Sequence, residues 1–276
     1  PDTPGIWQIK SWEWSDRGVQ LGLERVSPEI AGTLAGDAGA ANSPADDRIT
    51  KTLLQAVEVP PDDSPNPANR AIFAAATSES PGWRGAAVYV EQGASLEELG
   101  STGSTRAIAG STISSLGSSV CAVIEPTSEL IVHLAAEDLP FRTTDVLGLI
   151  NGANRLMVGG ELIQFLQAQS LGNGDWRLLG LLRGRAGTES AAIQGHDAGT
   201  NVVLLDEKVT LLEPALAPVS TEVRIASIGL ADEEPVFADL ENIGLSRRPL
   251  MPTAPQTRIE LDGDWRFCWT RRARGQ

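Results

Sequence analysis

The stretch NGANRLMVGGELIQFLQAQSLGNGDWRLLGLLRGRAGTE, residues 151–189, predicts a tight series of β-strands. The expected strands cover residues 156–158, 161–168 and 176–182. Gly159-Gly160 separates the first two, and Asn173-Gly174 separates the second pair. Because Asn-Gly between apolar runs is a strong signal for a two-residue hairpin turn, we expect these strands to be neighbours in one sheet.

The rest of the chain also alternates mostly with the period of two that is typical of strands. Further strands are expected at residues 6–14, 19–25, 52–59, 71–77, 86–91, 128–135, 201–205, 209–213, 221–229, 258–261 and 265–270. Short helical turns are expected at residues 94–100, after Asp145, and after Thr188, which can cap its helix. Residues 101–120, rich in Ser, Thr and Gly, fit either flat sheet edges or a long ordered loop. The predicted fold class is mainly β, with small β-barrel or sandwich domains and few short helices.

The composition limits the classes of function. The 276 residues include 41% hydrophobic residues, which is enough for real cores. No apolar run approaches the roughly 18 residues of a membrane span, so no membrane-spanning segment is expected. The net charge of −14 argues against a general nucleic-acid binder, because phosphate contacts need a basic face. We therefore expect no nucleic-acid sequence recognition.

Metal, cofactor and disulfide chemistry have little support in the sequence. Only Cys121, Cys268, His133 and His196 are present, which makes a closed structural zinc site improbable and excludes a disulfide framework, although a single bridge stays open. His133 lies in an apolar strand and is interpreted as a structural residue. No cofactor and no metal site are expected.

The charged residues of the opening stretch predict ion pairs rather than catalysis. GGEL and GLLRGRAG lack the spacing of a phosphate-binding loop, and no nucleophile elbow is present. Glu161, Asp175 and Glu189 could supply the paired carboxylates of a glycosidase, but neighbouring arginines offer them guanidinium partners. Such pairs could bridge the turn or cross a subunit boundary. The candidate ion-pair or assembly residues are Arg177, Arg183, Arg185, Glu161 and Glu189, and no catalytic residue is predicted.

Four tryptophans are candidates for a binding face. Trp7, Trp12 and Trp14 gather in the first expected hairpin, where Trp12 and Trp14 share a face, and Trp83 follows a Pro-Gly turn. Aromatic pairs spaced by two on a strand can bind sugars, but they more often belong to a core or a subunit interface. Both interpretations stay open for all four rings.

Several segments resemble one family. NGANRLMVGGELIQF, GNGDWRLLGLLRGRAGTE, GHDAGTNVVLLD, SWEWSDRGVQLGLERV and DGDWRFCWTRRARGQ resemble segments of phage tail-tip proteins and of the host-specificity protein, the baseplate hub or "megatron", of gene transfer agents. The resemblance covers most of the chain and little of residues 31–70. It implies a large, trimeric, mostly β protein that closes the end of a tail tube and carries further domains toward the host envelope. Some members contain a glycosidase-like barrel, whose alternating strands and helices are absent from this sequence.

The resemblance and the composition together suggest a domain organisation. Residues 1–30 are expected to be the terminal strands of a preceding hub domain, and residues 31–70 a loop or linker with one strand. Residues 71–246 form one or more β-rich hub domains, residues 247–256 a linker, and residues 257–276 the start of a fibronectin-type β-sandwich. Because such a sandwich needs about seven strands, we expect the sequence to be a piece of a longer protein.

The function expected from the resemblance is structural. The chain would belong to a tail tip or baseplate hub, act as a homotrimer with other tail proteins, and contact a host envelope receptor or glycan. It would be assembled in the bacterial cytoplasm and located in the virion or gene-transfer-agent particle. The alternatives are a carbohydrate-binding module that uses the tryptophans, and a cell-wall hydrolase that uses Glu161 or Glu189.

Overall fold

Two units make up the chain, Pro1–Asp46 and Asp47–Gln276, and each is described by itself. The structure is a computed structural model that describes residues 5, 7–15, 18–25, 48–60, 71–121, 123–213, 220–245 and 250–272. Residues 31–47 and 61–70 of the expected loop or linker at residues 31–70 lie outside these ranges. The described residues are mainly β, with two short helices, which confirms the predicted fold class.

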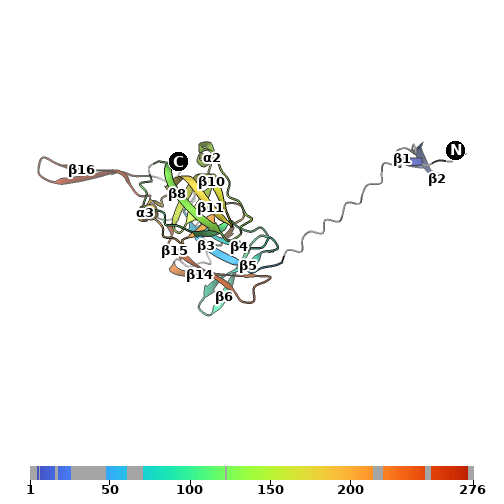
Figure 1. Cartoon of the computed structure of the whole chain (residues 1–276), viewed down its shortest axis with the longest axis horizontal. Coiled ribbons are helices and arrows are strands. Elements are labelled where there is room, and N and C mark those ends of the chain that lie inside the picture. The colour runs from blue at the N-terminus through green and yellow to red at the C-terminus, as the bar shows by residue number, and fades with distance from the viewer. Residues whose placement is uncertain are drawn as a thin grey trace. The chain divides into compact units, whose positions relative to one another are not determined.

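Six antiparallel strands of the second unit close into a barrel, in the order β10-β11-β8-β7-β12-β9 (Figure 1). Their bounds are β7 Ala109–Thr112, β8 Glu125–Leu134, β9 Arg155–Val158, β10 Glu161–Gly172, β11 Asp175–Arg185 and β12 Asn201–Leu204. Alternate apolar residues of these strands fill the interior, among them Leu130, Val132, Leu156, Val158, Ile163, Phe165, Leu178, Leu181 and Val202. Closure leaves the barrel without a free sheet edge.

The turns of the opening stretch have the predicted geometry. Asn173 and Gly174 both have positive φ, 52° and 77°, and join β10 to β11 in a two-residue hairpin. Gly159 and Gly160 join β9 to β10, with Val158 paired to Glu161. Both long strands exceed their predicted bounds, because the hydrogen-bonded ladder continues up to the Asn-Gly turn.

Two further sheets pack into a sandwich beside the barrel. One has the order β13-β4-β3 and the other the order β15-β14-β5-β6. Their bounds are β3 Leu53–Val59, β4 Ala71–Thr77, β5 Ala86–Gln92, β6 Ser95–Ser101, β13 Thr210–Leu212, β14 Ser220–Gly229 and β15 Val236–Asn242. Ile72 and Ala74 from the first sheet pack with Val88, Val90 and Ile225 from the second.

A third apolar cluster attaches the sandwich to the outside of the barrel. Val57 and Ala75 of the sandwich pack against Met157, Leu162 and Val203 of the barrel. Full burial of such side chains stabilises a fold by about 1.5 to 3 kcal/mol each. The attachment positions β3, and with it Glu58, next to the Gly159-Gly160 turn.

Two segments differ from the sequence predictions. Residues 94–100 were expected to be helical, but β6 forms a hairpin with β5, because pairing along the sandwich edge outweighs local preference. Within residues 101–120, β7 is an inner strand that bonds to both β8 and β12. Ala109-Gly110-Ser111-Thr112 carries few β-forming residues, which is why its strand character is not evident in the sequence.

The two short helices lie where the capping residues suggested. α2, Val146–Ile150, has Asp145 as its N-cap, and the Asp145 carboxylate accepts a hydrogen bond from the Gly148 N–H at 2.7 Å. α3, Glu189–Gln194, begins after Thr188, but that side chain makes no capping bond. Its hydroxyl instead accepts from the Leu162 N–H at 3.0 Å and ties the helix to β10. Among the described residues, neither helix has the length and hydropathy needed to cross a membrane.

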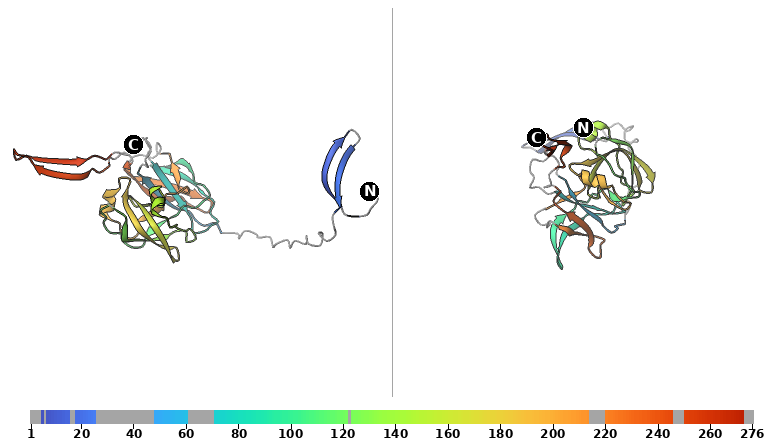
Figure 2. Two further views of the ribbon diagram at one scale, coloured as in Figure 1. Left: turned by 90° about the horizontal axis from the view of Figure 1, so that it is seen from above. Right: turned by 90° about the vertical axis from the view of Figure 1, so that its left-hand side faces the viewer.

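Two hairpins stand as two-stranded sheets of their own (Figure 2). β1, Trp7–Ser15, pairs with β2, Gly18–Arg25, in the first unit. β16, Thr253–Ile259, pairs with β17, Trp265–Thr270, in the second. β16 begins inside the predicted linker at residues 247–256, since the pairing of Thr253 with Thr270 extends the expected hairpin.

Candidate functional site

A buried ion pair joins the start of β10 to the end of β11. Glu161, the first residue of β10, is completely buried, and Arg183 near the end of β11 is nearly so. Arg183 donates from Nε to Glu161 Oε1 at 2.7 Å and from Nη2 to Oε2 at 2.8 Å. Arg183 also donates to the carbonyl oxygens of Gly117 and Ala192, at 3.1 and 3.5 Å. This two-pronged pairing satisfies the charge of both side chains inside the protein.

The Glu161 carboxylate is held ionised by its neighbours. Burial by itself would raise the pKa of Glu161, but hydrogen bonds from His196, Arg183 and the Gly184 N–H outweigh that effect and hold the pKa below its usual value. Glu161 therefore stays a carboxylate at neutral pH and accepts hydrogen bonds only.

His196 extends this network toward the surface. Its backbone pairs with Leu116 in both directions at 2.8 Å, which fixes the residue after the end of α3. Its Nε2 lies 2.7 Å from Glu161 Oε2, and because a carboxylate only accepts, Nε2 carries the proton. The opposite edge of the ring faces the Gly159 turn, where Nδ1 lies 3.7 Å from the position that a Cβ would occupy.

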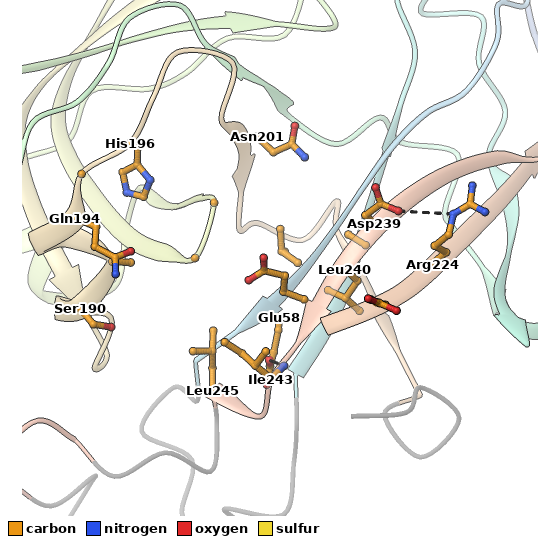
Figure 3. Close-up of a pocket in the computed structure, with 18 residues that line it drawn as sticks. Glu58, Ser190, Gln194, His196, Asn201, Arg224, Asp239, Leu240, Ile243 and Leu245 are labelled. Carbon is orange, nitrogen blue, oxygen red and sulfur yellow. Dashed lines mark hydrogen bonds and ion pairs between the residues drawn. The ribbon is translucent and has the colours of Figure 1, made fainter. Parts of the chain in front are cut away.

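That edge of His196 borders a cavity between the barrel and the sandwich, here called the junction cavity. Its volume is about 890 Å³. In Figure 3, Ser190, Gln194 and His196 lie on the barrel side, and Glu58, Leu240 and Asp239 lie on the sandwich side. Cavities of this size hold small ligands or inserted side chains.

Carboxylates dominate the charge around the junction cavity. Glu58, Glu222, Asp239 and Glu241 line the sandwich side, with Arg224 as the guanidinium among the lining residues. Glu58 Oε2 accepts from the N–H groups of Ile243 and Gly244 at 2.8 and 3.0 Å. The cavity is therefore electronegative on this side.

Arg224 is already engaged by other groups. It donates to Glu91 at 3.0 Å and lies 3.6 Å from Asp239, and its guanidinium covers the ring of Phe237 at 4.1 Å from the centroid. Its charge is largely neutralised by these partners, and the local balance stays negative.

The other predicted ion-pair residues do not join the Glu161 network as one site. Arg177 pairs with Glu129 at 3.2 Å on the barrel surface, and Arg185 Nε donates to Gln164 at 3.2 Å. Glu189 accepts from Arg272 at 2.6 Å, beyond β17. Of the predicted set, Arg183 and Glu161 form an ion pair with each other. Both residues belong to the same chain. Buried Arg183 is therefore not a surface residue available for subunit contacts.

Sequence reasoning missed both His196 and the sandwich side of the cavity. His196 was considered only as a possible metal ligand, and Glu58 lies in the strand expected at residues 52–59, with no partner predicted for it. Arg106, paired in two-pronged fashion with Asp138, was also missed. That contact, foremost the hydrogen bond from Arg106, lowers the pKa of Asp138. A charged residue inside an apolar run was the one usable signal for Glu58.

The four tryptophans have different environments. Trp83 is 2% exposed in the sandwich core, and its Nε1 donates to Thr52 Oγ1 at 3.0 Å. Its ring is thus a core element and is not presented to a glycan or a subunit, because the two sheets of the sandwich enclose it. Trp12 and Trp14 are 64% and 73% exposed, opposite Leu21 and Val19, and Trp7 is half-buried.

Metal and thiol chemistry have little basis in the described ranges. They contain no group of three or more His, Cys, Asp or Glu residues that could hold a metal ion. Cys121 and Cys268 are both free, so the single bridge that the sequence left open is not formed. Burial raises the pKa of the Cys121 thiol, which favours its protonated form at neutral pH.

The comparisons with known proteins concern the barrel. The family model described as Rcc01698-like, C-terminal, matches residues 107–203, a family typical of gene transfer agent-associated proteins. The match begins just before β7 and ends in β12, so it covers the barrel, α2 and α3 but neither the sandwich nor the two hairpins. A search of the curated proteins finds no match.

Proposed function

We propose that this chain is a structural part of a phage-like tail tip or baseplate hub. The observation that carries the proposal is the match of the closed barrel to the Rcc01698-like C-terminal family. In this role the chain helps to close the tail tube and to contact the host envelope during delivery. It works as a homotrimer, together with other tail and baseplate proteins, in a particle assembled in the bacterial cytoplasm.

The architecture is suited to a mechanical role. The barrel has no free edge, its base is fixed by the Glu161–Arg183 pair, and an apolar cluster anchors the sandwich to its wall. The β1–β2 and β16–β17 hairpins add exposed aromatic faces, including Trp12, Trp14 and Phe267. Exposed apolar faces of this kind are typical of surfaces that other chains cover.

Labelling of intact particles tests the location. A short epitope inserted after Gly93, in the exposed turn of the β5–β6 hairpin, should leave the fold intact because the turn lies outside every core cluster. Antibody bound to that epitope should appear at the tail tip in electron micrographs. Antibody along the tail shaft, or at the head, would contradict the proposal.

The subunit number is tested separately. Light scattering of the full-length protein should give three times the mass of one chain, to which this 276-residue sequence contributes 29.2 kDa per copy. A monomer mass would remove the trimer from the proposal and leave the location to the labelling experiment.

A carbohydrate-binding role is the second candidate, and the exposure of Trp12 and Trp14 favours it. Their rings lie on one face of the β1–β2 hairpin and are free to stack on sugars. Glycan-array binding that disappears in Trp12→Ala and Trp14→Ala, but persists in Trp83→Phe, would support this role. Silence of the wild-type chain on the array would end it.

A hydrolase based on Glu161 is disfavoured by geometry. A general acid needs a raised pKa and access to a leaving group, whereas the pKa of Glu161 is lowered and its side chain is completely buried. Glu189, already bonded to Arg272, is no better placed. We therefore propose no catalytic role for either carboxylate, and unchanged activity of Glu161→Gln on cell walls would agree with this.

A further inference from the structure

The short helix α2 presents an aliphatic surface to solvent at the outer edge of the barrel (Figure 1). Val146, Leu147 and Ile150 are 53%, 64% and 75% exposed, whereas Leu149 is buried. Ile150 follows Val146 by four positions and Leu147 by three, so the three exposed side chains share one face of the helix. These three side chains are here called the α2 knob.

Buried hydrogen bonds hold the α2 knob in place. Gln164, buried in β10, donates from Nε2 to the carbonyl oxygens of Leu149 and Ala153 at 2.9 and 2.8 Å. Asn154 donates from Nδ2 to the carbonyl oxygen of Arg142 at 2.8 Å and so joins the two ends of the loop that carries α2. The exposed aliphatic side chains therefore belong to a fixed element of the barrel rather than to a loosely attached loop.

The charge beside the knob is positive, although the whole chain has a net charge of −14. Residues 142–155 contain Arg142 and Arg155 and one acid, Asp145, which caps α2. Arg185 adds a third guanidinium, because its Nε donates to the Gln164 side chain at 3.2 Å beneath the helix. At about 0.15 M salt, exposed charges more than about 8 Å away are largely screened, so the nearby arginines set the local charge.

The size of the knob distinguishes between classes of partner. A stable protein interface buries about 800 Å² on each side, and three aliphatic side chains on one helical turn offer far less. Shallow insertion into a bilayer needs no such area, because each inserted side chain contributes by itself. The planar fork of an arginine pairs with phosphate oxygens, which lie at the bilayer surface. Aliphatic side chains beside arginines therefore fit a lipid surface better than a second copy of the chain.

We infer that the α2 knob is a contact site for a phospholipid surface. Val146, Leu147 and Ile150 enter the boundary between headgroups and acyl chains, and Arg142 and Arg185 lie at the level of the phosphates. Binding by one copy is weak and reversible, in the range of about millimolar lipid. The inference names a partner for the envelope contact and rests on the proposed function for that setting.

Flotation of the full chain with vesicles tests the inference apart from the location in a particle. The vesicles contain phosphatidylethanolamine and phosphatidylglycerol at a ratio of three to one. The wild-type chain should float with them, and Leu147→Ser with Ile150→Ser should weaken binding about tenfold or more. Val120→Ser with Leu230→Ser removes two aliphatic side chains that are 85% and 75% exposed elsewhere. This matched control should bind like the wild type.

A single arginine variant tests the charge. Arg142→Gln should weaken binding to the same vesicles about fivefold, the contribution of one arginine near an anionic surface. Arg142 is chosen over Arg185 because the Arg185 side chain also supports Gln164. Arg84→Gln, an exposed arginine of the sandwich, is the control and should leave binding unchanged.

Three outcomes would overturn the inference. They are a wild-type chain that does not float, a knob variant that floats as well as the wild type, and an equal loss in the control with Val120→Ser and Leu230→Ser. A wild-type oligomer that dissociates in the knob variant, without vesicle binding, would assign the knob to a second copy instead. None of these results moves an epitope on the particle, so the labelling experiment tests the proposed function independently.

Discussion

The β10–β11 and β16–β17 hairpins resemble each other in pattern and differ in environment. Both contain large apolar side chains, and both turn over a short segment that contains Gly. Phe165 of β10 is completely buried, whereas Phe267 of β17 is 65% exposed. An apolar side chain in a hairpin therefore contributes to stability only where a neighbouring element buries it.

Truncation of one phenylalanine in each hairpin tests this difference most strongly. Phe165→Ala should lower the free energy of unfolding by about 3 to 5 kcal/mol, because it opens a cavity beside Phe141 in the barrel interior. Phe267→Ala should change it by less than about 0.5 kcal/mol. Guanidinium unfolding followed by tryptophan fluorescence gives both values. A large loss for Phe267→Ala would mean that another chain covers β17 in solution.

The buried ion pair offers a second contrast, with a surface pair in the same barrel. Arg183→Met should cost about 3 to 5 kcal/mol, because it leaves the Glu161 charge buried without its main partner. Arg177→Met removes the exposed pair with Glu129 and should cost less than about 1 kcal/mol.

A double variant separates the loss of the ion pair from the cost of leaving the Glu161 charge buried without a partner. Adding Glu161→Gln to Arg183→Met should recover part of the lost stability, because it removes the stranded charge. Equal losses for Arg183→Met and Arg177→Met, measured by urea unfolding, would show that the buried pair does not stabilise the barrel.

Close packing inside the barrel wall predicts a third, smaller effect. At Gly110 of β7 a Cβ would lie 1.9 Å from the His133 carbonyl oxygen of the neighbouring strand β8. Gly110→Ala should therefore cost about 1 to 3 kcal/mol as the two strands separate. Gly160→Ala, with nothing within 4 Å, is the matched control in the β9–β10 turn. Equal melting temperatures of the two variants would argue against this strand register.

Local signals in the sequence were sufficient for much of this fold. Asn173-Gly174 and Gly159-Gly160 predicted their turns because backbone chirality restricts which residues adopt positive φ. β7 and β6 could not be predicted in this way, since Ala109-Gly110-Ser111-Thr112 and the acidic segment of β6 become strands only through their neighbours. Such strand pairing is a property of the assembled sheets.

The site was predictable only in part, for a related reason. Arg183 and Glu161 lie 22 positions apart on strands joined by one hairpin, so their pairing followed from local topology. His196 meets Glu161 from beyond α3, and Glu58 faces the same cavity from a different sheet. Contacts that depend on how the barrel and the sandwich pack together leave no periodic signal in the sequence.

The smallest predicted effect is on the loss of stability at acid pH. It again compares the barrel with the exposed hairpin. Because the pKa of Glu161 is lower in the folded chain than the ordinary value of 4.5, its ionised form favours folding. This stabilisation is fully present above the ordinary pKa of 4.5. It is lost as the pH falls through the lower pKa that Glu161 has in the folded chain. Glu161→Gln should therefore show a shallower loss of stability than the wild type between about pH 5 and pH 2.

Glu260 supplies the control for that comparison, because it pairs with Arg258 and Arg266 on the exposed β16–β17 hairpin. Glu260→Gln should leave the acid branch of the unfolding curve unchanged, since the hairpin contributes little to the core that unfolds. If Glu260→Gln flattened the pH dependence and Glu161→Gln did not, the acid sensitivity would belong to the hairpin. The stabilising charge would then be Glu260 on the β16–β17 hairpin. That result would mean that a partner chain covers this hairpin, which is exposed in the single chain.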